Sequence, residues 1–156
     1  MGDSMALQVG QTAPEFQLEA DDGSAFSLSQ ARGQRLLLVF YPGDETPVCT
    51  AQLCDYRDGI EAFAELGVEV IGISRDDAAS HQRFKQARGL PFRLLSDPDL
   101  AVARRYGATG LLGMKRAVFL IDEQGSVAYA HVEALALFRR SREELLQVLA
   151  GLPVRS

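Results

Sequence analysis

Residues 36–54 read LLLVFYPGDETPVCTAQLC, and they contain both cysteines of the chain, Cys49 and Cys54. The apolar run at the start of this segment is typical of a β-strand that is buried on both faces of a sheet. A turn follows it. Thr46 then suits the N-cap of a helix, and Pro47 suits its first position, where a missing N–H costs no hydrogen bond. We therefore expect a strand, a turn and a helix that carries Cys49 in its first turn.

The place of Cys49 on this helix favours a reactive thiol. The backbone N–H groups of a first helical turn have no partner within the helix, and the helix dipole puts partial positive charge at the same end. A thiol held there is expected to ionise more easily than a free thiol. We interpret Cys49 as a reactive cysteine and Cys54 as its resolving partner.

The rest of the chain alternates between strand and helix patterns. A β-hairpin is expected within 7–28, followed by a short helical turn that ends at Gly33. Strands are expected at 35–41, 68–74, 92–95, 117–121 and 127–132, and helices at 47–66, from 76 or 77 to about 88, from about 98 to 107, and from 141 to about 150. Residues 108–115 are expected to form a loop.

This order of elements predicts an α/β protein with a thioredoxin fold. The order is β-α-β-α and then β-β-α, with a hairpin extension at the N-terminus and an insertion between the two halves, so we expect a central mixed β-sheet flanked by helices. The right-handed crossover rule makes the first half a parallel unit. Because sites in such sheets lie beyond the carboxyl ends of strands, the turn that follows strand 35–41 is the expected site.

The composition is that of an ordinary globular protein. The chain has 156 residues, of which 47% are apolar and 24% charged, and we expect residues 1–156 to form a single domain. A net charge of −5 argues against general nucleic-acid binding. No apolar run approaches the roughly 20 residues of a membrane span, and no signal peptide is visible. We therefore expect a cytoplasmic protein without a membrane anchor.

The cysteine and histidine content favours redox chemistry over a metal site. Two cysteines do not make a disulfide scaffold in a chain of this size. The two histidines, His81 and His131, lie far from the cysteines in sequence, and a C-x4-C pair lacks the usual zinc-ligand spacing. We assign neither histidine a role and expect no metal.

A helical wheel separates the two thiols. Five residues share the face of Cys49 and are expected to be buried: Leu53, Tyr56, Ile60, Phe63 and Ala64. Cys54 lies at about 140° from Cys49, on the polar side. The two α-carbons of an intact helix would be about 8–9 Å apart, whereas a disulfide needs less than about 7 Å. If these thiols form a bond, oxidation must therefore be coupled to local unfolding around residues 47–55.

The motif Pro42-x-x-x-Thr46-x-x-Cys49 resembles the signature of the peroxiredoxins. A second cysteine five residues later resembles the bacterioferritin-comigratory (PrxQ-like) subfamily. Two later motifs resemble the same family, Arg105-Tyr106-Gly107 and Arg116-x-x-Phe119-Leu120-Ile121-Asp122. The resemblance extends over residues 7–150, nearly the whole chain.

This resemblance implies a thiol-dependent peroxidase that reduces hydrogen peroxide and organic hydroperoxides. Cys49 would attack the O–O bond and become a sulfenic acid, while Thr46 bonds the substrate, Pro42 shields the sulfur and Arg116 supplies a fixed cation. Cys54 would then form an intramolecular disulfide with Cys49, which thioredoxin or a similar dithiol protein would reduce. The family resemblance implies no metal, haem or flavin, and it allows a monomer or a weak homodimer.

Three residues depart from the usual subfamily pattern. Val48 stands where glycine is frequent, Gly43 where lysine is common, and Gln52 where an acidic residue is usual. If that residue supports the arginine, a neutral amide is expected to loosen it. These departures bear on the rate and on the preferred peroxide more than on the type of reaction.

Two other functions remain open from the residues. A thioredoxin-like disulfide reductase would predict C-x-x-C rather than C-x4-C. A redox-switched binding module would use unfolding around 47–55 to expose a surface for a partner.

Overall fold

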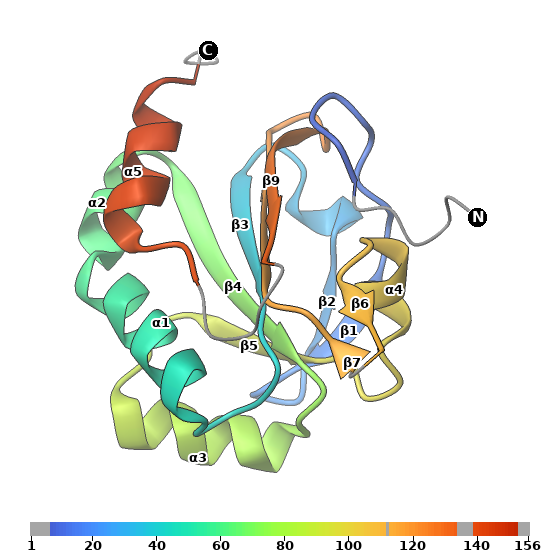
Figure 1. Cartoon of the computed structure of the whole chain (residues 1–156), viewed down its shortest axis with the longest axis vertical. Helices are drawn as coiled ribbons and strands as arrows, with labels where there is room; N and C mark the ends of the chain where they lie inside the picture. The colour runs from blue at the N-terminus through green and yellow to red at the C-terminus, as the bar shows by residue number, and fades with distance from the viewer. Residues whose placement is uncertain (1–6, 112, 134–138, 153–156) are drawn as a thin grey trace.

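The computed structural model describes residues 7–111, 113–133 and 139–152. Its main sheet has seven strands: β1 Gln17–Ala20, β2 Ala25–Ser27, β3 Arg35–Phe40, β4 Val68–Ser74, β5 Arg93–Ser96, β8 Ala117–Ile121 and β9 Val127–Val132. Their order across the sheet is β2-β1-β5-β4-β3-β8-β9 (Figure 1). Strands β3, β4 and β5 are parallel, whereas β8 runs antiparallel to β3. The predicted thioredoxin fold, with an N-terminal hairpin and a central mixed sheet, is confirmed.

Helices cover both faces of this sheet. One face carries α1 Pro47–Asp58, α2 Ile60–Glu65, α3 Ala78–Arg88 and α5 Arg142–Ala150, and the other face carries the short helix α4 Ala101–Arg105 (Figure 1). The predicted helical turn is the 3-10 helix η1 Ser29–Ala31. The region expected to be a loop contains a small hairpin, β6 Thr109–Gly110 and β7 Gly113–Met114. No helix within the described part of the chain is both long and apolar enough to cross a membrane.

Strand β3 divides the core into two apolar layers. Side chains alternate between the faces of a strand, so Leu36, Leu38 and Phe40 pack into the layer under α4, and Leu37 and Val39 pack into the layer under α1. None of these five side chains is more than 1% exposed. The expectation of a strand buried on both faces is confirmed.

The predicted helix over 47–66 is interrupted at Gly59. The N–H of Gly59 donates to the carbonyls of both Asp55 and Tyr56, and a new helix, α2, begins at the next residue. A Cβ on Gly59 would lie 2.9 Å from Cδ of Arg142, so the glycine leaves room for the first residue of α5. Ala64, which lies after this break, is exposed to solvent. The expectation that it is buried is wrong.

The helix ends follow the signals in the sequence. The carboxylate of Asp77 accepts from the N–H of Ser80 at the start of α3, and Gly89 ends that helix with a left-handed φ of 64°. Ser141 and Glu144 form the predicted capping box at the start of α5. These local bonds explain why both helices begin where the sequence predicts.

A substitution at Gly72 tests how tightly the central strand is packed. A Cβ there would lie 2.8 Å from Cδ2 of Leu94 and 3.1 Å from Cε1 of Tyr41, both of which are completely buried. Because these neighbours have no room to move, we expect Gly72→Ala to lower the free energy of unfolding by about 1–3 kcal/mol in urea denaturation.

The matched control is Gly151→Ala. A Cβ at Gly151 would meet only two backbone oxygens, each at 3.7 Å. We expect this control to change the free energy of unfolding by less than about 0.5 kcal/mol. Equal losses in the two variants would contradict the packing argument.

Candidate active site

The first turn of α1 places Cys49 at the carboxyl end of β3. Thr46 is the N-cap, with φ −80° and ψ 150°, and Pro47 is the first helical residue, as predicted. The hydroxyl of Thr46 does not cap the helix; it donates to the carbonyl of Gly43 over 2.9 Å. The side chain of Cys49 is completely buried in the apolar layer under α1.

Arg116 meets Cys49 from a distant part of the sequence. It directly precedes β8, the antiparallel neighbour of β3, and it is 3% exposed. Its Nη1 lies 3.1 Å from Sγ of Cys49, although the two residues are 67 positions apart. A guanidinium is permanently charged, so the sulfur of Cys49 faces a fixed cation. The structure thus brings together two of the predicted site residues.

Gln52 holds Arg116 in place. Its side-chain oxygen accepts from Nη1 of Arg116 over 2.9 Å, and its nitrogen donates to the hydroxyl of Tyr56 over 3.0 Å. A neutral amide supplies both an acceptor and a donor, which an ionised carboxylate cannot do. The amide of Gln52 therefore supports Arg116, although a neutral residue at this position was expected to loosen it.

The chain of hydrogen bonds continues to the segment before α5. The hydroxyl of Tyr56 donates to the carbonyl of Arg140 over 2.5 Å. Burial raises the pKa of Tyr56 above its ordinary value, so this hydroxyl keeps its proton. The sequence named Gln52 only as a departure that was expected to loosen the arginine, and it placed Tyr56 only on the buried face of the helix. The available signal was a polar amide on the apolar face of the helix, one turn after Cys49.

The turn between β3 and α1 contains the other two predicted site residues. Pro42 is partly buried and Thr46 is exposed. Between them, Glu45 has a left-handed φ of 62°, a conformation that costs an ordinary residue about 1–2 kcal/mol. The turn therefore needs bonds from its surroundings to keep this shape.

Asp44 supplies those bonds. Its carboxylate accepts from the hydroxyl of Tyr41 over 2.6 Å and from that of Ser80 over 2.8 Å, and its N–H donates to Oδ2 of Asp76 over 2.8 Å. Burial by itself raises the pKa of the Asp44 carboxyl. The hydrogen bonds from His81 and Tyr41 and the charge of His81 outweigh burial and bring it below its ordinary value.

His81 differs most from its expected place. The sequence offered no reason to assign it a role, but His81 is completely buried on the inner side of α3. Its Nδ1 lies 2.8 Å from Oδ2 of Asp44, and its Nε2 lies 3.1 Å from the carbonyl oxygen of Leu95. The available signal was its place three residues before the buried Phe84, on the inner face of α3.

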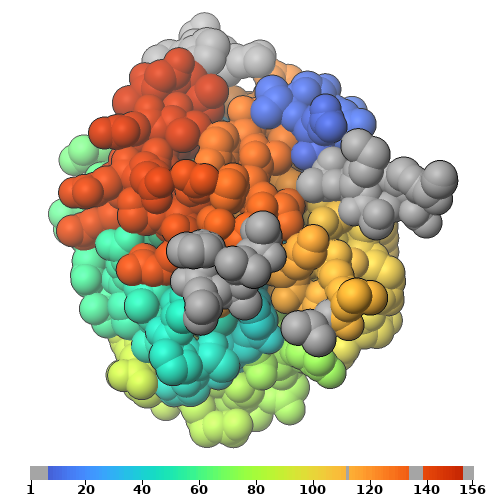
Figure 2. All heavy atoms as spheres, in the orientation of Figure 1, coloured from blue at the N-terminus to red at the C-terminus, as the bar shows by residue number. Residues whose placement is uncertain are grey.

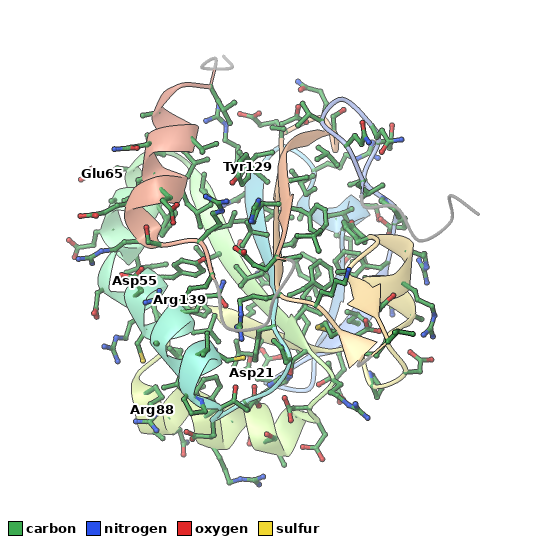
Figure 3. All side chains as sticks on the ribbon, in the orientation of Figure 1. Asp21, Asp55, Glu65, Arg88, Tyr129 and Arg139 are labelled. Atoms are coloured by element: carbon green, nitrogen blue, oxygen red, sulfur yellow. The ribbon has the colours of Figure 1, made fainter. Side chains whose placement is uncertain are left out.

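Cys54 lies on the same helix and is partly buried. Both cysteines are free thiols, and α1 is continuous between them. The next residue, Asp55, ties α1 to α5: its Oδ2 accepts from the N–H of Arg142 over 2.8 Å and lies 3.4 Å from Nη1 of Arg139 (Figure 3). Figure 2 shows α5, in red, directly above α1, in teal. The second half of α1 is therefore tied to the start of α5.

Metal ligands do not gather in the described part of the chain. Across residues 7–111, 113–133 and 139–152, no group of three or more His, Cys, Asp or Glu side chains is placed to bind a metal ion. The arrangement around Cys49 instead suits nucleophilic attack by sulfur, because it combines a buried thiol, a fixed cation and the open N–H groups of a first helical turn.

The family match and the relatives similar in sequence point to the same group of proteins. Residues 9–130 match the AhpC/TSA family. A putative peroxiredoxin bcp of Coxiella burnetii is 42% identical, over 80% of this chain and 87% of its own length. Peroxiredoxin Bcp of Bacillus subtilis is 40% identical, over 78% of this chain and 82% of its own length.

Solved structures agree with these sequences. The crystal structure of peroxidoxin BcpB from Mycobacterium tuberculosis matches with a TM-score of 0.84 and 30% identity, covering 95% of this chain and 99% of that one. Bacterioferritin comigratory protein of Xanthomonas campestris, described for its alkyl peroxide reduction activity, matches with a TM-score of 0.82 and 25% identity, over 92% and 98% of the two chains. Sequence and structure together show that this chain belongs to the AhpC/TSA family and, within it, to the Bcp and Q peroxiredoxins.

Proposed function

We propose that this peroxiredoxin, a thiol-dependent peroxidase, reduces hydrogen peroxide and organic hydroperoxides with Cys49 as its nucleophile. One observation carries the proposal: the buried sulfur of Cys49 lies 3.1 Å from Nη1 of Arg116, at the first turn of α1. The fixed positive charge favours a thiolate, which is the nucleophilic form of cysteine. A related protein described for alkyl peroxide reduction supports the organic substrate.

The first step forms a sulfur–oxygen bond and breaks the O–O bond. The thiolate of Cys49 attacks one peroxide oxygen, and the other oxygen leaves with the electron pair and takes up a proton, giving water or an alcohol. The sulfur becomes a sulfenic acid. The N–H groups of Val48 and Cys49 are available to stabilise the leaving oxygen, since the first N–H groups of a helix have no partner within it.

Thr46 and Pro42 are the residues that we propose to orient and protect the reacting atoms. The hydroxyl of Thr46 donates its hydrogen to the carbonyl of Gly43. Its oxygen therefore keeps lone pairs that can accept a hydrogen bond from a hydroxyl group of the substrate. Pro42 stands at the start of the same turn and shields the sulfenic acid from water. Both assignments follow from the family motif and from the position of the turn.

The second step joins the two cysteines. The thiol of Cys54 attacks the sulfenic acid of Cys49, water leaves, and a disulfide forms. In an intact helix the two α-carbons are about 8–9 Å apart, so the first turns of α1 must unwind. The contacts of Asp55 with α5 favour unwinding that stops before this residue. A dithiol protein similar to thioredoxin then reduces the disulfide by exchange.

The remaining features of the proposal follow from the sequence and the family. We propose a single domain that acts as a monomer or weak homodimer in the cytoplasm, without a role in nucleic-acid binding. A thioredoxin-like disulfide reductase is disfavoured because its two cysteines are expected in C-x-x-C spacing, and here four residues separate them within one helix.

Replacing each cysteine separates the two steps. We expect Cys49→Ser to abolish peroxide consumption in stopped-flow assays, because the nucleophile is lost. We expect Cys54→Ser to consume one equivalent of peroxide and then to accumulate a sulfenic acid, detected by dimedone labelling. Wild-type consumption rates in Cys49→Ser would contradict the proposal.

Oxidation is expected to loosen only the first half of α1. Peptide mapping of peroxide-treated protein should link Cys49 to Cys54 within one chain, and hydrogen exchange should speed up over residues 47–54 but not over 55–58. The reduced protein is the control. An intermolecular link, or exchange that stays slow over 47–54, would contradict the unwinding step.

Removing the fixed cation tests the role of Arg116. We expect Arg116→Met to slow alkylation of Cys49 by iodoacetamide about tenfold or more at neutral pH, because loss of a neighbouring positive charge disfavours the thiolate. Arg104→Met is the control, since Arg104 is exposed and bonds only locally, to the carbonyl of Asp99. Equal alkylation rates in both variants would contradict the role.

A further inference from the structure

His81 is a completely buried ionisable group that none of the proposed reaction steps uses. Both of its ring nitrogens face oxygen atoms. Nε2 lies 3.1 Å from the carbonyl oxygen of Leu95, which carries no proton, so Nε2 must be the donor in that bond. Nδ1 lies 2.8 Å from Oδ2 of Asp44. The protonation of the ring therefore depends on which of these two side chains, His81 or Asp44, holds the proton between them.

The surroundings of Asp44 favour the ionised pair. Its Oδ1 accepts from the hydroxyl of Tyr41, and its Oδ2 accepts from the hydroxyl of Ser80. Hydrogen bonds donated to a carboxylate stabilise its charged form. With Asp44 ionised, the hydrogen bond over 2.8 Å needs a proton on Nδ1, so the geometry points to a ring that donates from both nitrogens.

This pair lies directly beside the strained part of the active-site turn. Asp44 immediately precedes Glu45, whose φ of 62° persists only where neighbouring contacts hold the backbone. Asp44 ties the turn to Tyr41, the residue directly after β3, and to Ser80 and His81 on α3. It also ties the turn to Asp76, in the segment after β4. One residue after Glu45, Thr46 completes the turn and bonds the carbonyl of Gly43.

We propose that His81 is a positioning residue for peroxide reduction, which as an imidazolium holds Asp44 and thereby fixes the turn that carries Thr46 beside Cys49. The inference rests on the proposed function of Cys49 and adds a residue from α3 to it. His81 does not touch the reacting atoms. It acts through the shape of the turn, whereas Arg116 contacts the sulfur of Cys49 directly.

Other titratable groups surround this pair in the described part of the chain. Tyr41 is neutral, since burial, and next the charge of Asp44, raise its pKa well above the ordinary value. Asp76 accepts from the N–H of Asp44 and from the hydroxyl of Ser74, which directs its carboxylate toward the turn backbone. On α3 itself, Asp77 caps the helix through Ser80, and Lys85 pairs with Asp21. From β5 the ring meets the carbonyl of Leu95.

The protonation claim can be tested directly on the reduced wild-type protein. Two-bond ¹H–¹⁵N correlations of the imidazole rings distinguish a ring with two N–H groups from a ring with one. At about pH 7.5, where an unpaired imidazole is mostly neutral, we expect two N–H groups on His81. The variant His131→Asn assigns the signals. A ring with one N–H group would overturn the proposal.

The positioning claim needs two rates for each variant. In His81→Asn, we expect the second-order rate of peroxide reduction to fall about tenfold or more, because reacting groups displaced by a fraction of an ångström lose orientation. Alkylation of Cys49 by iodoacetamide should stay within about twofold of wild type, because Arg116 is untouched and alkylation does not require an oriented peroxide. His131→Asn, on β9, is the control and should change neither rate.

Asp44→Asn provides a second variant if His81→Asn does not fold. It is expected to remove the second ring proton of His81 and to lower the rate of peroxide reduction without changing alkylation. Equal losses in both rates, or no loss in either, would overturn the positioning role. Failure of the proposed function has a different result, since wild type and Cys49→Ser would then consume peroxide equally slowly.

Discussion

A buried guanidinium beside a buried sulfur sets most of the constraints on this fold. A charge removed from water is costly unless it is paired and hydrogen-bonded, and Arg116 is almost completely buried with Cys49 and Gln52 as partners. Its position depends on the pairing of β3 with β8, in which Phe40 lies opposite Ala117. A slip of one residue would turn the alternate side chains of β8 to the other face and move Arg116 away from the sulfur. The register of two core strands is therefore also a condition for the chemistry.

The helix that carries both thiols has two different anchors. In its second half, Asp55 bonds the first residue of α5 and Tyr56 bonds the segment that precedes α5. Its first half is held by the burial of Cys49 and Leu53 and by the contact of Gln52 with Arg116. Because those contacts surround the sulfur itself, covalent change at Cys49 alters the anchor of the first half and leaves that of the second half intact. The proposed disulfide would use this difference, because only the first half of the helix has to unwind for it to form.

Sequence alone predicted what short-range physics controls. The buried strand at 35–41, the start of α1 at Thr46 and Pro47, and the caps at Asp77 and Ser141 all depend on neighbouring residues, and all are present. Arg116 was assigned through the family motif. The break at Gly59 was not predicted, and the side chain that packs against this glycine, Arg142, comes from another helix. His81 was missed for the same reason: its partner Asp44 lies 37 positions away, and no periodic pattern connects an aspartate in a turn to a histidine on a later helix.

The absence of a side chain at Gly72 also contributes to the active-site turn. The ring of Tyr41 passes so close to this glycine that any Cβ would meet Cε1 at 3.1 Å. With the ring seated there, its hydroxyl reaches Oδ1 of Asp44 at 2.6 Å. The missing side chain of Gly72, in the middle of β4, thus makes room for the ring that holds the active-site turn. Substitutions in the interior of the sheet are consequently able to change catalysis without altering any residue that meets the peroxide.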